Sequence, residues 1–193
     1  MDRAVLVRRA FHLSSPAWLV WYWVPPGSWI DVRKEFVLLF LFAGALLIEG
    51  TRLFLGFRIP GLREYEADRI SGYAWGSLGL AVGLLVFPGE LVIPTFWGMA
   101  WIDPMCGYLR KAGRPMVFSV AAYVALWLAV STVVVPWAPY QTTPLTVPDL
   151  VLFAPIAGAV AVAVERPNLK HVDDDFLMFV VPLLALAALS LAV

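Results

Sequence analysis

The sequence predicts an all-α protein that forms a single transmembrane domain over residues 1–193, with about seven membrane-spanning helices. Two observations carry this prediction. The chain is 61% hydrophobic and only 15% charged, with a mean hydropathy of +0.81, whereas a soluble domain is about half apolar and a quarter charged. The apolar residues also gather into seven runs separated by charges, prolines and glycines, as expected of spanning helices.

The first apolar run is the least regular. It covers Phe11–Val24, contains Pro16, and at 1.5 Å per residue is shorter than the roughly 30 Å hydrocarbon core of a bilayer. It could begin as early as Val5, which would put Arg8 and Arg9 on the same helix. The second and third runs cover residues 36–55 and 70–87.

The remaining four runs cover residues 91–109, 116–136, 150–164 and 176–193. In the first of these, Pro104 and Gly107 predict a break in the helix, because proline removes a backbone hydrogen bond and glycine is a weak helix former. Backbone groups freed at membrane depth are tolerated only where they are buried in protein or line a polar cavity. The break is therefore expected to mark a polar site beside Asp103.

Basic residues are distributed unevenly between the two sides. With seven spans in alternation, twelve of the fourteen Lys and Arg residues fall on one side, and only Arg33 and Lys34 fall on the other. Because loops rich in basic residues stay in the cytoplasm, the N-terminus is expected there. The same assignment gathers the unusual polar residues at the cytoplasmic ends, so an active site is expected to face the cytosol.

Several classes of function are excluded. Cys106 is the single cysteine, which excludes a disulfide framework and a multi-cysteine zinc site. The net charge is zero, so no strongly basic face for nucleic acid is expected. The chain contains no P-loop, no kinase signature set, no G-x-S-x-G and no H-E-x-x-H. Phosphoryl chemistry, if present, must use another scaffold.

The densest group of charges lies between the sixth and seventh runs, where residues 165–175 read E-R-P-N-L-K-H-V-D-D-D. Its three adjacent carboxylates, at positions 173–175, repel one another and are costly to desolvate at the mouth of a membrane helix. Mg²⁺ with a polyphosphate would offset that cost, and Lys170 would add a positive charge for phosphate. The alternative is a solvated loop whose charges only fix the topology.

Two groups of charged residues accompany the first and second runs. The motif R-R-A-F-H places Arg8, Arg9 and His12 on one helix face, where the arginines either bind phosphate or only fix the topology. Glu49 and Arg52 are three residues apart, the spacing of an ion pair within a helix. An intramembrane carboxylate is also a candidate functional residue.

Two further segments lie on the same side. Residues 63–72 are amphipathic, with Glu66 and Arg69 one turn apart. This segment either forms a helix on the membrane surface or brings a carboxylate near a nucleotide or its metal. Asp103 ends an apolar run and precedes a basic segment, a combination that suits metal and phosphates. The basic residues of that segment are Arg110, Lys111 and Arg114.

Four motifs together resemble the dolichol kinase family, in particular its short archaeal members. They are R-R-A-F-H (8–12), R-E-Y-E…S-G-Y (63–73), D-P-M-C-G (103–107) and V-D-D-D (172–175). Phytol kinases, the fungal CTP-dependent diacylglycerol kinase and phosphatidate cytidylyltransferase-like proteins are related. The resemblance spans nearly the whole chain. It implies transfer of the γ-phosphate of CTP to a lipid hydroxyl with the help of Mg²⁺, chemistry that depends on positioning and charge neutralisation.

The resemblance also implies roles for single residues. Asp103, Asp173 and Asp174 would bind Mg²⁺ or the nucleotide and act in catalysis. His12, or one of the carboxylates, would accept or orient the proton of the alcohol, and Glu165 would orient the nucleotide or the metal shell. The remaining candidates for binding nucleotide or phosphate are Arg8, Arg9, Glu66, Arg69, Arg110, Lys111, Arg114 and Lys170.

The sequence departs from the family pattern at three places. Ile102 stands where glycine usually precedes the aspartate, and Asp175 stands where asparagine usually ends the acidic motif. The Lys-Ser/Thr-x-x-Gly segment that follows the aspartate in many relatives is missing after Asp103.

The function expected from these patterns is a CTP-dependent polyprenol kinase, a multi-pass protein of the cell membrane that makes a polyprenyl phosphate and contacts membrane lipids. One alternative is a cytidylyltransferase that makes a CDP-lipid from CTP and a phosphorylated lipid. The other is a non-catalytic lipid-binding or transport protein in which the charges only hold helices in place.

Overall fold

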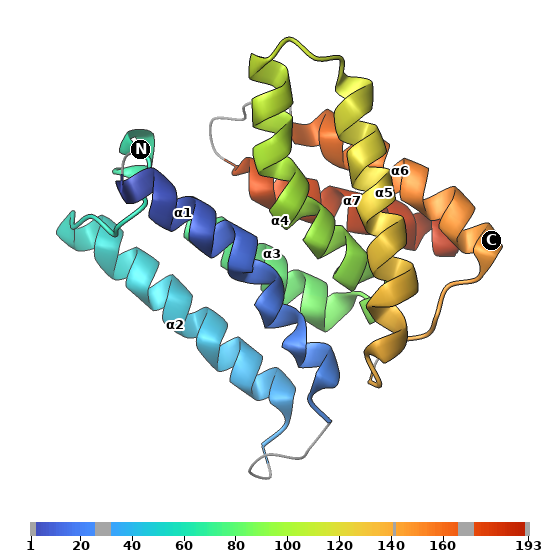
Figure 1. Ribbon diagram of the computed structural model, residues 1–193. Coiled ribbons are helices and arrows are strands. Elements are labelled where there is room, and N and C mark those ends of the chain that lie inside the picture. Colours follow the sequence, from blue (N-terminus) through green and yellow to red (C-terminus); the bar gives the residue numbers. More distant parts are fainter. Residues whose placement is uncertain (1–2, 26–31, 141, 166–171, 192–193) are drawn as a thin grey trace.

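The computed structural model describes residues 3–25, 32–140, 142–165 and 172–191, and every regular element in these ranges is helical (Figure 1). The α-helices in the described residues are α1 (Arg3–Ser14), α2 (Lys34–Leu55), α3 (Gly72–Val86), α4 (Gly89–Lys111), α5 (Met116–Val133), α6 (Val147–Glu165) and α7 (Asp174–Ser190). Three short 3₁₀ helices accompany them: η1 (Ser15–Trp23), η2 (Glu64–Glu66) and η3 (Val135–Trp137). The prediction of an all-α protein is confirmed.

The first apolar run is divided between α1 and η1. Helix α1 starts at Arg3, so Arg8 and Arg9 do share a helix with His12. The switch to 3₁₀ geometry follows from Pro16, which has no N–H to bond the carbonyl four residues earlier. That carbonyl belongs to His12, and it accepts a hydrogen bond from Oγ of Ser15 at 2.7 Å instead.

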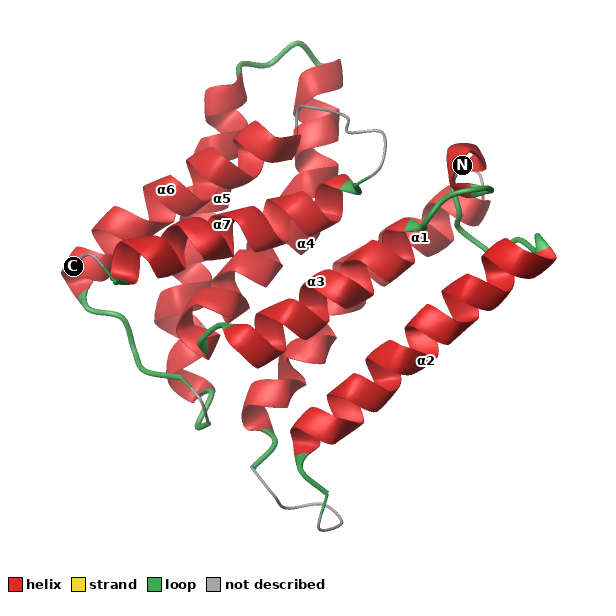
Figure 2. Cartoon of the chain, turned by 180° about the vertical axis from the view of Figure 1, so that it is seen from behind, coloured by secondary structure: helices red, strands yellow, loops and turns green. Residues whose placement is uncertain are grey.

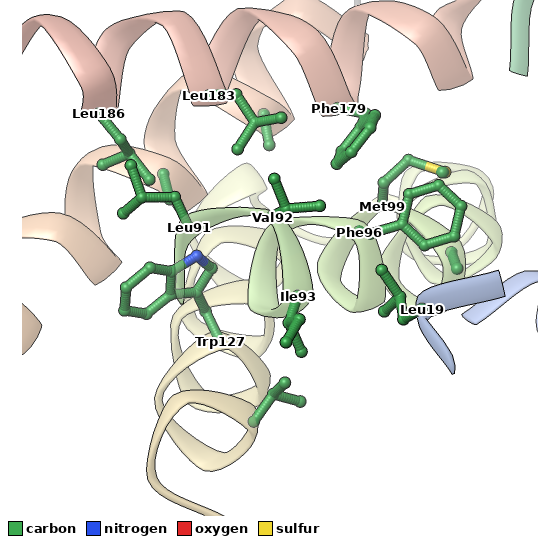
Figure 3. Close-up of a cluster of buried hydrophobic side chains, with 14 of the residues drawn as sticks. Leu19, Leu91, Val92, Ile93, Phe96, Met99, Trp127, Phe179, Leu183 and Leu186 are labelled. Atoms are coloured by element: carbon green, nitrogen blue, oxygen red, sulfur yellow. The ribbon is translucent and has the colours of Figure 1, made fainter. Parts of the chain in front are cut away.

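Helix α4 lies at the centre of the fold and packs against α5, α7, α1 and η1. Figure 3 shows the core that it forms with α7, where Val92 and Phe96 face Leu183 and Phe179. The rings of Phe96 and Phe179 meet edge to face, with centroids 4.9 Å apart. Burial of these apolar side chains between α4 and α7 stabilises this half of the molecule.

The predicted break in α4 is wrong. The helix continues from Gly89 to Lys111 through both Pro94 and Pro104. Each proline removes one backbone hydrogen bond, but the residues around them are packed on several sides, with Pro94 and Ile102 buried. Tertiary packing therefore keeps the helix regular, and Asp103 is presented on an intact helix.

Helix α2 lies at one edge of the bundle, beside α3 (Figure 1 and Figure 2). Much of its apolar surface is exposed, including Phe40, Leu47 and Phe54. Exposed apolar surface on this scale is typical of a face that contacts lipid or another protein. The helix ends at Gly56, whose φ of 68° is the left-handed conformation that glycine adopts readily.

Among the described residues, three helical segments are long and apolar enough to cross a membrane: Lys34–Leu55, Met116–Trp137 and Val147–Glu165. Helix α3 is apolar but has only 15 residues. Crossing of the membrane by all seven helices, and the side on which each end lies, stay predictions.

Candidate functional site

Charged side chains from four segments meet in one cluster. They come from α1, from the segment before α3, from α4 and from the start of α7, and the N-terminus of α3 lies among them. The residues are Arg8, His12, Arg63, Glu66, Asp103, Asp173, Asp174 and Asp175, and we call this set the polar cluster. The sequence motifs at residues 8–12, 63–73, 103–107 and 172–175 are therefore brought together, as predicted.

His12 lies between two carboxylates. Its Nε2 is 3.8 Å from Oδ2 of Asp103, and its Nδ1 is 3.6 Å from Oδ2 of Asp175. Both distances are too long for a direct hydrogen bond. Nε2 of His12 and Oδ1 of Asp175 are buried and make no hydrogen bond. Buried polar atoms are normally paired, so the space between these side chains suits a ligand that would satisfy them.

The three aspartates form the first turn of α7. Asp173 is the N-cap, and its Oδ1 accepts a hydrogen bond from the backbone N–H of Asp175 at 3.1 Å. Burial, reinforced by the charge of Asp174, raises the pKa of Asp173 above its ordinary value. Carboxylates at a helix N-terminus are stabilised by the helix dipole, yet three of them in a buried position still repel one another.

Two groups of side chains within the described residues could hold a metal ion. One consists of His12, Asp103 and Asp175, and the other of Asp173, Asp174 and Asp175; in each, the candidate ligand atoms lie within 4.8 Å of one another. The predicted metal ligands Asp103, Asp173 and Asp174 thus belong to two groups, and Asp175 belongs to both. Asp175 was not among the predicted ligands.

Two arginines offset part of this negative charge. Arg8 lies 3.4 Å from Oε1 of Glu66 and 3.7 Å from Oδ2 of Asp175. Arg63 lies 3.7 Å from carboxylate oxygens of both Asp173 and Asp174. Burial disfavours the charge of Arg63, but the charges of Asp174 and Asp173 and the contact with Tyr65 together outweigh burial and raise the pKa of the guanidinium. Both arginines are placed to bind a phosphate that approaches the carboxylates with a metal.

Glu66 organises the backbone around the cluster. Its side chain is buried and accepts hydrogen bonds from the backbone N–H of Arg63 at 2.7 Å and of Gly72 at 3.0 Å. A Cβ at Gly72 would lie 3.0 Å from Oδ2 of Asp173, so a larger residue there would crowd this carboxylate. Arg69, which was paired with Glu66 in the prediction, lies over the ring of Tyr65, 4.4 Å from its centroid.

Glu49 and Arg52 form a buried ion pair on α2, so the simpler of the two predictions is confirmed. The pair also fixes the segment that carries Arg63 and Glu66. Arg52 donates to the backbone carbonyls of Glu66, Ala67 and Arg69, and Glu49 accepts from the backbone N–H and the hydroxyl of Ser71. This ion pair therefore holds the backbone of the segment that carries Arg63 and Glu66, and so positions these two members of the polar cluster.

The predicted phosphate-binding residues at the end of α4 make fewer contacts with the polar cluster. Arg110 pairs with Glu165 of α6, and Glu165 is buried and close enough to Asp103 to repel its charge. Lys111 and Arg114 are exposed. Arg9 is exposed on α1, and Lys170 lies outside the described residues.

A cavity of about 400 Å³ opens beside the polar cluster. Arg8, His12 and Asp175 line one part of it. Its other lining residues are mainly apolar: Phe11, Ser15, Trp18, Leu38, Phe40, Leu41, Phe42, Gly44, Ala45, Ile48, Gly72, Tyr73, Gly76, Ser77, Leu80, Phe96 and Met99. Pockets of roughly 300–1,000 Å³ with apolar walls and a few polar groups are typical of small-molecule sites.

Sequence reasoning did not name Arg63 as a site residue, counted Asp175 in the acidic triplet without naming it as a ligand, and missed the cavity. Arg63 stands in the motif that carries Glu66, and Asp175 directly follows Asp174. Both could have been predicted as site residues because they adjoin residues that were predicted. The cavity depends on how α1, α2 and α3 pack, which no local pattern describes.

Comparison of the chain with protein-family models, with curated proteins and with solved structures finds no match in any of the three.

Proposed function

We propose that the protein is a CTP-dependent lipid kinase that phosphorylates an isoprenoid alcohol. The observation that carries this proposal is the direct contact between a cluster of carboxylates and arginines and an apolar cavity lined by His12 and Asp175. A phosphorylated nucleotide needs the charged side, and a lipid needs the apolar side. The choice of CTP and of an isoprenoid rests on the resemblance of the motifs.

The residues present fit Mg²⁺. This ion prefers oxygen ligands and binds through one or two carboxylates together with substrate phosphates. The turn of α7 supplies Asp173, Asp174 and Asp175, and Asp103 lies on the other side of His12. The unpaired buried Oδ1 of Asp175 is the type of atom that such an ion would satisfy. When bound, Mg²⁺ would neutralise charge on the transferred phosphoryl group.

The chain's own residues account for the other requirements of phosphoryl transfer. Arg8 and Arg63 would hold phosphate oxygens, and His12 would accept the proton of the lipid hydroxyl. The lipid oxygen forms a bond to the γ-phosphorus, the bond from that phosphorus to the bridging oxygen breaks, and CDP leaves. The proton of the hydroxyl goes to His12, which faces both the cavity and Asp103.

The test is a product assay on the purified protein with Mg²⁺, γ-labelled CTP and a short polyprenol. Label in the lipid phase is expected, and Asp103→Asn should abolish it. Asp68→Asn is a matched control, because Asp68 is exposed in the segment before α3, and it should keep the wild-type rate. Label that appears only with α-labelled CTP and a phosphorylated lipid would instead establish a cytidylyltransferase. Absence of product in both assays would favour a non-catalytic lipid-binding protein.

A further inference from the structure

Helix α2 is held to the rest of the protein mainly near its two ends. At one end, the buried Nζ of Lys34 donates hydrogen bonds of 3.0 Å to the backbone carbonyls of Trp21 and Val24. At the other end, Glu49 and Arg52 hold the segment before α3. The buried residues of α2 are Lys34, Leu38, Glu49 and Arg52, so three of the four belong to these end contacts.

Between its ends, α2 forms one wall of the cavity. The lining residues of this wall run from Leu38 to Ile48. The facing walls come from α1 and η1 and from α3, with Phe96 and Met99 of α4 behind them. Some residues that line the cavity are also exposed. They stand on α1 and η1, at Phe11 and Trp18, and on α2, at Phe40, Leu41 and Ile48. The cavity therefore opens to the outside between these two elements.

The two ends of the cavity indicate the kind of ligand that it would bind. The inner end carries Arg8, His12 and Asp175 and suits a single polar head group. The mouth is apolar and adjoins the exposed apolar face of α2, which suits a hydrocarbon chain that continues into lipid. A cavity of about 400 Å³ lies near the lower limit for a drug-sized ligand, so it holds only the first part of a long chain.

We propose that this cavity binds the isoprene units next to the hydroxyl of the lipid alcohol, and that the rest of the chain leaves between η1 and α2 into the bilayer. The inference rests on the proposed function for the nature of the lipid. It adds that the protein selects the hydroxyl-proximal part of the chain and tolerates different lengths beyond it.

Two glycines provide a direct test. Gly44 of α2 and Gly76 of α3 line the cavity, and a Cβ built at either position has no heavy atom within 4 Å. The first atom of a new side chain therefore has room at both positions, and Gly44→Leu and Gly76→Leu would fill space that the lipid chain would occupy. Leucine is also a better helix former than glycine. Gly50→Leu is the matched control, since Gly50 is on α2, has the same open surroundings and does not line the cavity.

The experiment measures binding without nucleotide. The full chain in detergent is irradiated with a farnesol analogue that carries a diazirine, and the labelled peptides are identified by mass spectrometry. We expect labelling on residues 38–48 or 72–80, competed both by farnesol and by a long-chain polyprenol. Gly44→Leu and Gly76→Leu should each lower it at least tenfold, and Gly50→Leu should leave it unchanged. Size-exclusion profiles and melting temperatures check folding, and the two variants lie on different helices, so one remains informative if the other fails to fold.

Three results would overturn the inference. They are wild-type labelling in folded Gly44→Leu and Gly76→Leu, an equal loss of labelling in Gly50→Leu, and competition by diacylglycerol but not by polyprenol. The last result would assign the cavity to an ordinary membrane lipid. Failure of the proposed function would give a different result. If labelling occurs as expected but no phosphorylated product forms, the kinase proposal is rejected and the lipid-binding cavity is retained. Conversely, if Gly44→Leu and Gly76→Leu phosphorylate the lipid at the wild-type rate, the cavity is not the lipid site and the kinase proposal is retained.

Discussion

Asp175 belongs to both groups of candidate metal ligands. Its surroundings indicate which property of its side chain, the oxygen or the charge, the site needs. One of its oxygens faces His12 and Arg8, and the other is buried without a hydrogen bond. Under the proposed function, the related lipid kinases usually have asparagine at this point of the motif. Both side chains offer an oxygen ligand to Mg²⁺, so the position requires an oxygen more than it requires a charge.

This argument predicts different outcomes for two substitutions. Asp175→Asn should remain active but should need more Mg²⁺ for half-maximal rate, on the order of tenfold, or about 1.4 kcal/mol of binding free energy. Asp175→Leu is similar in size, has no oxygen and should be inactive. The measurement is initial rate as a function of Mg²⁺ concentration. Equal activity of the leucine variant and the wild type would remove Asp175 from the site.

The position of His12 leads to a second prediction at the scale of one residue. Its two ring nitrogens face carboxylates of Asp103 and Asp175, and it lines the cavity where a hydroxyl would enter. If it accepts the proton, His12→Gln should lower kcat by about 10²–10⁴-fold and leave labelling by the farnesol analogue nearly unchanged. A parallel loss of lipid labelling would show that His12 shapes the cavity instead of acting on the proton.

At the scale of elements, the contact between α2 and the segment before α3 depends on one buried arginine. Arg52 pairs with Glu49 and donates to three backbone carbonyls. Removing one partner of a buried ion pair costs about 3–5 kcal/mol. Arg52→Met should therefore lower thermal stability strongly and also lower activity, because Arg63 and Glu66 are held by the same segment. Arg58→Met, which changes an exposed arginine just beyond α2, is the control for loss of charge and should have little effect on melting.

The contact between α4 and α5 contains a buried polar network that does not involve the site. Oγ1 of Thr95 accepts a hydrogen bond from Nε1 of Trp127, and the Thr95 carbonyl accepts one from the hydroxyl of Tyr123, both at 3.2 Å. Thr95→Val leaves the indole N–H unpaired, which costs about 1–3 kcal/mol. Thermal melts should show this loss. Thr132→Val, on an exposed part of α5, should melt like the wild type.

At the scale of the whole molecule, the sequence predicted the helices much better than their arrangement. In the described part of the chain, apolar runs located α2 to α7 closely, since helix formation is read from nearby residues. The first run, Phe11–Val24, proved to be divided between α1 and η1. The motifs also predicted which segments would meet. The uninterrupted α4 was missed because packing overrode Pro104, and the buried Lys34 was treated only as a topological signal. The cavity could not be predicted, because it arises from α2 being held at its ends, a property of tertiary contacts alone.

The accumulation of carboxylates should make the stability of the whole protein depend on both pH and Mg²⁺. The pKa of Asp173 is raised in the folded state, so the folded protein holds this proton more tightly than the unfolded chain, where the pKa is about 3.9. Stability should therefore fall as the pH rises from about 4 through the raised pKa. Mg²⁺ binds the deprotonated carboxylates, and at 100 times its Kd it would add about 2.7 kcal/mol. Melting in detergent with and without Mg²⁺, at matched ionic strength, should show stabilisation that increases with pH and is lost in Asp173→Asn. An equal effect of Mg²⁺ on that variant, or at every pH, would show that the ion binds elsewhere.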